Sequence, residues 1–171
     1  MGLFDFFKKR ETNMATNADK LKQTAPTSVY IPEEKLEGRE FTLDGKPGFG
    51  VFNVNAMQLE PKPIFGWCLH LLMLPKEEPE SGVIEEKEYI DMQDYCDKLS
   101  NILVDNPEHT NSIFVARITH SAHIECYWYV NNPELANSSL QKIISEKRSP
   151  FPFQYEMVRD AEWNKAQFWL K

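Results

Sequence analysis

Residues 64–74 have the sequence IFGWCLHLLML, a nearly continuous apolar run of 11 residues. Pro61 and Pro63 stand just before it, and the loop sequence PKEEPESGV follows at residues 75–83. A membrane-spanning helix needs about 20 apolar residues, so the run is too short to cross a bilayer. Residue types common in β-strands at the start of the run, together with the prolines before and after it, favour a strand over a helix. Because both of its faces are apolar, we expect a central strand that is buried on both sides.

The patterns downstream of this run alternate between helix and strand. The predicted elements are a helix over residues 85–104, strands over 112–119 and 122–130, a helix over 132–148, a strand over 151–158 and a short terminal helix capped by Asp160. Asn132 is expected to cap the second helix, with Pro133 in its first turn. From residue 64 onward the order is therefore β-α-β-β-α-β followed by a helix. That order is typical of the ferredoxin-like α+β fold, in which the first strand is central.

The residues before the run predict a hairpin and a linker. Residues 39–56 form two extended stretches around the turn residues Asp44 and Gly45, and we expect this hairpin to extend or flank the sheet. Residues 11–29 are polar and lack apolar periodicity, which is typical of a linker. The predicted organisation is a flexible or helical N-terminal tail and linker over residues 1–29, then a single α+β domain over residues 30–171.

Composition and charge argue against several classes of protein. The chain has 171 residues, of which 42% are hydrophobic, and a chain of this length is expected to form about one domain. Its 26 acidic residues outnumber 19 basic ones and give a formal net charge of −7, which argues against a nucleic acid as the main partner. Cys68, Cys96 and Cys126 are odd in number and form no C-x-x-C pair, so we expect a reduced, cytoplasmic protein.

The first ten residues, MGLFDFFKKR, do not form a secretory signal, because their charges follow a very short apolar stretch. Five apolar residues beside three basic ones could still touch a membrane surface or the groove of a partner. A short helix that packs loosely or frays is the alternative. We expect no membrane association apart from this segment.

Several short motifs together resemble a known family. They are Gly38-Arg39-Glu40-Phe41, Asp44-Gly45-Lys46-Pro47, Phe52-Asn53-Val54-Asn55, Glu125-Cys126-Tyr127-Trp128-Tyr129 and Asp160-Ala161-Glu162-Trp163. Over roughly residues 30–170 the chain resembles the domain-of-unknown-function 695 family of bacterial proteins, which brings no established activity. That family is similar to the protein B regulator of ribonuclease E, a small acidic protein inhibitor. The resemblance therefore implies a compact α+β binding module more than an enzyme, and it supplies no catalytic residues.

The densest chemistry lies in residues 120–126, with the sequence HSAHIEC. A metal site would use His120, His123 and Cys126, but strand alternation points His123 and Cys126 to opposite faces, and no further Cys or His pair completes a tetrahedral set. We therefore expect no metal. His123 and Glu125 share a face, and an acid–base pair of this kind would suit a small hydrolase or transferase. Neither of the common glycine-rich phosphate-binding motifs occurs, so we expect no cofactor.

The same strand face is a candidate binding surface. A two-residue turn at Ser121-Ala122 would place His120 opposite His123, and Ala116 opposite Tyr127. The candidate face consists of Phe114, Ile118, His120, His123, Glu125, Tyr127 and Tyr129. Tyrosines with a polar rim suit a protein interface. The face could instead be covered by the hairpin or by the terminal helix with its tryptophans.

An RNA-binding role for this face is a further alternative, because Tyr127 and Tyr129 could stack on bases. The net negative charge, Glu125 on the same face and the missing glycine–aromatic signature of RNA-recognition modules all argue against it. Of these interpretations, we favour a cytoplasmic, non-enzymatic module that acts through protein–protein interaction or self-association.

Arg117 is an anomaly in this pattern. By alternation it falls with Val115, Cys126 and Trp128 on the core face of its strand. A buried arginine without a partner would be very costly. We therefore expect a place near the sheet edge, a salt bridge with a carboxylate such as Glu156 or Asp160, a strand register other than the predicted one, or a site for a small anionic ligand.

Overall fold

The computed structural model describes residues 28–105 and 110–171. Contacts divide the chain into one unit of residues 1–30 and another of residues 31–171, and the second unit contains the sheet and its helices. The predictions for the N-terminal ten residues lie outside the described residues, as do those for most of the linker. None of the described helices is both long and apolar enough to cross a membrane.

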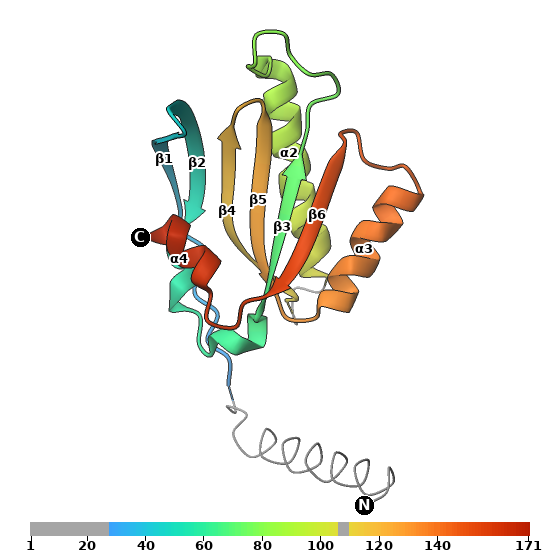
Figure 1. Ribbon diagram of the computed structural model, residues 1–171. Helices are drawn as coiled ribbons and strands as arrows, with labels where there is room; N and C mark the ends of the chain where they lie inside the picture. Colours follow the sequence, from blue (N-terminus) through green and yellow to red (C-terminus); the bar gives the residue numbers. More distant parts are fainter. Residues whose placement is uncertain (1–27, 106–109) are drawn as a thin grey trace, which may run out of the picture. The chain divides into compact units, whose positions relative to one another are not determined.

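The second unit is an α+β structure built on one six-stranded antiparallel sheet, which confirms the predicted class (Figure 1). Its elements are β1 (Leu36–Leu43), β2 (Lys46–Asn53), η1 (Ala56–Gln58), η2 (Lys62–Phe65), β3 (Trp67–Met73), α2 (Glu86–Val104), β4 (Ser112–His120), β5 (His123–Val130), α3 (Pro133–Ser145), β6 (Phe153–Arg159) and α4 (Asn164–Leu170). The strand order is β1-β2-β4-β5-β3-β6. The apolar run thus supplies β3, an interior strand between β5 and β6, while the narrower ferredoxin-like assignment stays a prediction.

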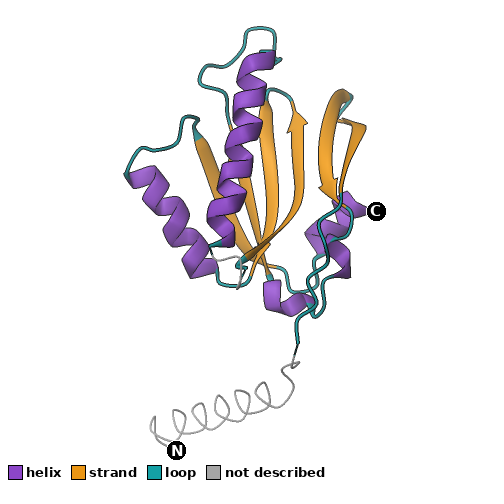
Figure 2. Cartoon of the chain, turned by 180° about the vertical axis from the view of Figure 1, so that it is seen from behind, coloured by secondary structure: helices purple, strands orange, loops and turns teal. Residues whose placement is uncertain are grey.

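Helices cover both faces of the sheet, and each face has its own core. Figure 2 shows α2 and α3 side by side on one face, whereas Figure 1 shows α4 on the other. The first core joins α2 and α3 to the sheet through residues such as Leu69, Leu99 and Trp128. The second lies under α4 and the two 3-10 helices and includes Phe52, Tyr129 and Trp163. The sheet therefore has apolar contacts on both sides, as the apolar run at residues 64–74 predicts for its central strand.

The N-terminal hairpin extends the sheet by two strands. β2 pairs with β4 in antiparallel register from Gly48 opposite His120 to Phe52 opposite Ala116. On one face the hairpin packs against α4, where Trp169 lies against the rings of Phe41 and Phe52. On the other face α2 and α3 stop short of it (Figure 2). The helix layer is thus narrower than the sheet.

Local chemistry explains the ends of the helices. The Asn132 side chain accepts a hydrogen bond from the Leu135 N–H at 3.1 Å, which is the predicted cap of α3. Asp160 accepts the N–H groups of Asn164 and Lys165 at 3.0 and 2.9 Å, so it caps the first turn of α4 as expected, although Trp163 is the residue at the N-cap position. Ser121 and Ala122 both have positive φ, as a two-residue turn between β4 and β5 requires.

A β-bulge in β4 changes which side chains face the candidate surface. The register between β4 and β5 shifts between Phe114 and Ala116, so Val115 is an extra residue. Phe114 therefore pairs with Trp128 and packs edge-on against it, on the α2 side of the sheet. The prediction that Phe114 lies beside Tyr127 and Tyr129 is wrong. Beyond the bulge, the predicted pairs of His120 with His123 and Ala116 with Tyr127 are confirmed.

Candidate functional site

The polar residues of the predicted face converge on one carboxylate. Glu125 on β5 accepts hydrogen bonds from His70 Nε2 on β3 at 2.8 Å, from His123 Nε2 at 3.2 Å and from the Tyr127 hydroxyl at 2.7 Å. The His70 ring also stacks on the Tyr127 ring, with centroids 4.6 Å apart. We call these four residues the histidine cluster. The predicted pairing of His123 with Glu125 is present, and His70 joins it from the neighbouring strand.

These contacts explain how the pKa values of Glu125, His123 and Tyr127 differ from their usual values. Hydrogen bonds from His123 and His70 hold the pKa of Glu125 well below its usual range. The hydrogen bond to Glu125 raises the pKa of His123. Burial, together with donation to Glu125, raises the pKa of Tyr127. Glu125 is therefore an ionised acceptor, and Tyr127 keeps its proton.

His123 is a poor general base in this arrangement, because both of its ring nitrogens are engaged. Its Nδ1 donates to the Ser121 carbonyl at 3.1 Å, and its Nε2 donates to Glu125. His70 differs, since its Nδ1 lies 3.8 Å from Glu156, beyond ordinary hydrogen-bond distance. An acid–base pair at this cluster would therefore use His70 with Glu125. Sequence reasoning missed His70, although a histidine inside an apolar strand was the available signal.

Most of the large side chains of the predicted face are buried. Tyr129 stacks on Trp163 with ring centroids 4.1 Å apart, and its hydroxyl donates to Asp160 at 2.6 Å. Ile118 is likewise buried, and Trp169 packs against Tyr127 at 5.8 Å. The terminal helix thus covers this part of the face, which is the alternative that the sequence left open. His120 remains partly exposed and donates from Nε2 to the Leu43 carbonyl at 3.0 Å.

Arg117 lies on the α2 side of the sheet opposite Cys126, as predicted. Its partner is Asp97 on α2, at 2.8 Å, and the expectation of Glu156 or Asp160 is wrong because both lie at the far end of the sheet order, on or beyond β6. The same Nη1 also donates to the Gln93 carbonyl at 3.3 Å. Its Nε is buried without a hydrogen-bond partner among the described residues. Arg117 therefore ties β4 to α2.

Beside α2, the uncovered face of the β1–β2 hairpin forms a second candidate site. Leu36 on β1 and Phe49 and Val51 on β2 point to this face, because they pair with residues of the α2 side. Leu36 is 51% exposed and Phe49 is 41% exposed. We call the channel between this face and α2 the α2 groove. Sequence reasoning did not find it, since no segment by itself reveals how far a helix layer extends.

Two hollows make up the α2 groove. The narrow end has a volume of about 520 Å³ and the wide end about 1330 Å³. They lie next to each other along β2, where Val51 lines the first and Phe49 the second. They are also neighbours along α2, where Asp97 lines the first and Gln93 the second. Arg117, bonded to both Asp97 and Gln93, lies at the junction. The two hollows are thus neighbours along β2 and α2, with the contacts of Arg117 to α2 between them.

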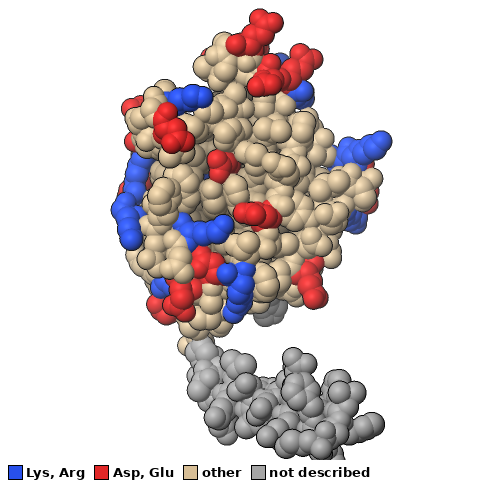
Figure 3. All heavy atoms as spheres, viewed as in Figure 1, with Lys and Arg blue, Asp and Glu red and all other residues tan. Residues whose placement is uncertain are grey.

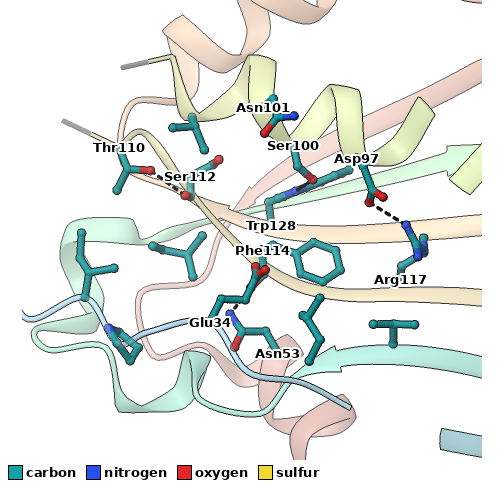
Figure 4. Close-up of a pocket in the computed structure, with 16 residues that line it drawn as sticks. Glu34, Asn53, Asp97, Ser100, Asn101, Thr110, Ser112, Phe114, Arg117 and Trp128 are labelled. Carbon is teal, nitrogen blue, oxygen red and sulfur yellow. Dashed lines mark hydrogen bonds and ion pairs between the residues drawn. The ribbon is translucent and has the colours of Figure 1, made fainter. Parts of the chain in front are cut away.

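The two ends of the groove differ in their linings. The wide end is bounded by the hairpin, the start of α2 and the loop before it, with Val83 exposed at its edge. The narrow end is bounded by Glu34 and Leu36, the C-terminal half of α2 and the start of β4 (Figure 4). There the Trp128 indole N–H donates to Ser100 at 2.9 Å, and Asn53 donates to the Phe114 carbonyl at 3.0 Å. The narrow end therefore combines apolar surface with fixed polar groups.

No described group of three or more His, Cys, Asp or Glu residues is arranged to hold a metal ion. Comparison with protein families gives a match to the model described as a family of unknown function (DUF695), over residues 40–170. The comparisons with curated proteins and with solved structures found no match. The family expected from the sequence motifs is thus confirmed, whereas the resemblance to the protein B regulator of ribonuclease E stays a prediction.

Proposed function

Since this chain belongs to the family of unknown function DUF695, we propose a function from its own surface: it is a non-enzymatic protein-binding module whose α2 groove takes an amphipathic helix of a partner protein. The observation that carries the proposal is the uncovered hairpin face, where Leu36 and Phe49 are exposed next to a helix. We place the module in the cytoplasm, in keeping with its odd number of cysteines.

The dimensions of the groove support a helical occupant. Neighbouring strands lie about 4.8 Å apart, so the two hairpin strands provide a face roughly 10 Å wide. Packed helices lie about 8–10 Å apart, so one further helix beside α2 would cover that face and complete the helix layer. Binding of an amphipathic helix in an apolar groove is a common form of peptide recognition.

Charge at the wide end supports a basic rim on that helix. Glu40, Glu78 and Glu86 line the wide end, and Lys46 is its one lining cation among the described residues. Figure 3 shows acidic side chains gathered at the top of the molecule, where Figure 1 places the loop of residues 75–85. Rim charges of this kind mainly raise the association rate and make it depend on salt. We therefore expect the partner helix to carry lysine or arginine beside its apolar stripe.

The alternatives from the sequence have less support. An acid–base role for His123 is disfavoured because both of its ring nitrogens are engaged. RNA stacking on the tyrosine face is disfavoured because Tyr129 is buried under Trp163. The α2 groove is by comparison open, and exposed apolar side chains such as Leu36 and Phe49 line it.

Site-specific photo-cross-linking tests the proposal. A photoreactive benzoylphenylalanine replaces Phe49 in the groove or Phe168 on α4, which is 68% exposed on the opposite face. The full-length protein is irradiated in lysate of its source. We expect one protein to cross-link through position 49 and not through position 168. Equal cross-linking at both positions, cross-linking at neither, or an adduct with a second copy of this chain would overturn the proposal.

Substitutions in the groove provide a second test. Phe49→Asp is expected to abolish capture of the cross-linked protein, and Ile144→Asp on the exposed side of α3 is the matched control. Both positions are solvent-exposed, although the Phe49 ring lies over Gly38, so each variant should stay folded with a loss of at most about 1–2 kcal/mol. If Phe49→Asp folds and still captures the protein with unchanged affinity, the groove is not the binding surface.

A further inference from the structure

We infer that the narrow end of the α2 groove is a recognition pocket for a single lysine or arginine side chain of the bound partner helix. The inference rests on the proposed function and specifies the chemistry of the partner at one position. It draws on three independent features of the narrow end: its charge balance, its apolar wall and its position on the groove axis.

The charge balance of the narrow end leaves one carboxylate uncompensated. Its lining contains two acidic side chains, Glu34 and Asp97, and one basic side chain, Arg117. Asp97 and Arg117 neutralise each other in an ion pair of 2.8 Å. Glu34 forms no ion pair with any residue that the structure describes. The pocket thus carries a net charge of about −1, which favours a cation.

Figure 4 shows how these groups are arranged. The Asp97–Arg117 pair lies toward one end, and Glu34 lies apart from it, near Asn53. Glu34 is an exposed residue, and partial burial of its carboxyl, followed by the negative charge of Asp97, raises its pKa. A cation beside Glu34 would offset both effects, because it stabilises the ionised carboxylate. Glu34 is therefore a group whose environment improves when a positive ligand arrives.

The wall of the pocket suits the aliphatic part of a long basic side chain. The apolar lining includes Ile31, Leu36, Val51, Val104, Phe114 and Trp128. Lysine and arginine place their methylene groups along such surfaces while the charged head reaches a polar group. A volume of about 520 Å³ falls within the roughly 300–1000 Å³ of typical ligand pockets, so the pocket has room for one long side chain.

The position of the pocket links it to the helix in the groove. Val51 lines the narrow end and lies two residues from Phe49, which lines the wide end on the same face of β2. A helix seated on Phe49 therefore passes the mouth of the pocket. One side chain from that helix, close to its apolar stripe, is placed to enter it. This adds a defined anchor to the diffuse charge attraction of the wide end.

A peptide selection tests the inference. A displayed library of short amphipathic helical peptides is sorted for binding to the full-length protein. We expect the selected peptides to share a lysine or arginine at one fixed position relative to their apolar stripe. Affinities of one such lysine peptide are then measured for the wild type, for Glu34→Gln, and for Glu33→Gln as the matched control, since Glu33 does not line the pocket.

The expected result is a loss of about tenfold in affinity for Glu34→Gln, equivalent to about 1.4 kcal/mol, and no change for Glu33→Gln. Replacing the peptide lysine by uncharged norleucine should cause a similar loss with the wild type and no further loss with Glu34→Gln. Thermal unfolding followed by circular dichroism establishes that both variants are folded.

The failures of the two proposals are distinguishable. If the selected peptides lose binding with Phe49→Asp but bind Glu34→Gln as tightly as the wild type, the recognition pocket is overturned and the groove function stands. If selected peptides bind Phe49→Asp unchanged, or if selection yields no binding peptide, both are overturned. A selected set without a fixed basic position also overturns the pocket.

Discussion

Replacing Tyr129 with phenylalanine tests how α4 is held on the sheet. The Tyr129 hydroxyl donates to the Asp160 carboxylate at 2.6 Å and accepts the Ala166 N–H at 3.2 Å. Asp160 in turn caps α4 through the N–H groups of Asn164 and Lys165. Burial acts to raise the pKa of Asp160, but these hydrogen bonds lower it below its usual value. One hydroxyl thus joins β5, the cap and the first turn of α4.

The expected loss follows from these contacts. A hydrogen bond to a charged group contributes about 1.5–3 kcal/mol, and a buried N–H left without an acceptor costs about 1–3 kcal/mol. Ala166 is buried, so its N–H has no access to water once the hydroxyl is removed. Because the two effects overlap, we expect Tyr129→Phe to lower the free energy of unfolding by about 2–4 kcal/mol. That is a large part of the roughly 5–15 kcal/mol of a typical domain.

Tyr127→Phe is the matched comparison. Its hydroxyl bonds to Glu125, which keeps His70 and His123 as donors, so a loss of about 1–2 kcal/mol is expected. Urea unfolding followed by far-ultraviolet circular dichroism measures both variants. Equal losses, or a loss below about 1 kcal/mol for Tyr129→Phe, would refute the reasoning that this hydroxyl anchors α4.

Three further predictions concern other parts of the fold. Because the pKa of His123 is raised in the folded state, its contribution to stability is present below its unfolded pKa of about 6.5 and is lost as pH rises through the folded pKa. Between about pH 6 and pH 9, the urea midpoint of the wild type should therefore fall, and that of His123→Asn should change less. Parallel curves for the two proteins would contradict this prediction. Burial raises the pKa of Cys68 to about 11 and the pKa of Cys126 above its usual value. A disulfide reagent should therefore leave both thiols unmodified until the protein unfolds. Rapid labelling of these two thiols in the native protein would contradict this prediction. Asn132→Ala removes the cap of α3 and should lower the free energy of unfolding by about 1 kcal/mol, which denaturant unfolding measures. An unchanged denaturant midpoint would mean that the cap does not contribute to stability.

Much of the fold could be predicted because its signals are local. The apolar run at residues 64–74 predicted β3, and Asn132 and Asp160 marked the starts of α3 and α4. The turn at Ser121-Ala122 set the pairing of β4 with β5 as far as the bulge. In each case a few neighbouring residues determine the backbone, so their chemistry can be interpreted without the rest of the chain.

The candidate site was less predictable because it depends on distant contacts. His70 meets Glu125 only because β3 pairs with β5, 55 residues away in the chain. Tyr129 is buried because α4 returns across the sheet and places Trp163 on its ring. The α2 groove exists because the hairpin adds two strands to a sheet whose helix layer does not follow. None of these relations leaves a pattern within a single segment.

The bulge in β4 has a consequence for comparing members of this family. In a regular strand, side chains three residues apart point to opposite faces. Phe114 and Arg117 are three apart, yet both line the narrow end of the α2 groove, because the extra residue Val115 shifts the alternation between them. A relative that lacks a residue at this point has a spacing of two, so it builds the same wall with a regular strand. A relative that keeps the spacing of three in a regular strand instead turns its aromatic ring to the α4 side. A one-residue gap opposite Val115 therefore marks a relative that retains this pocket, not one that has lost it.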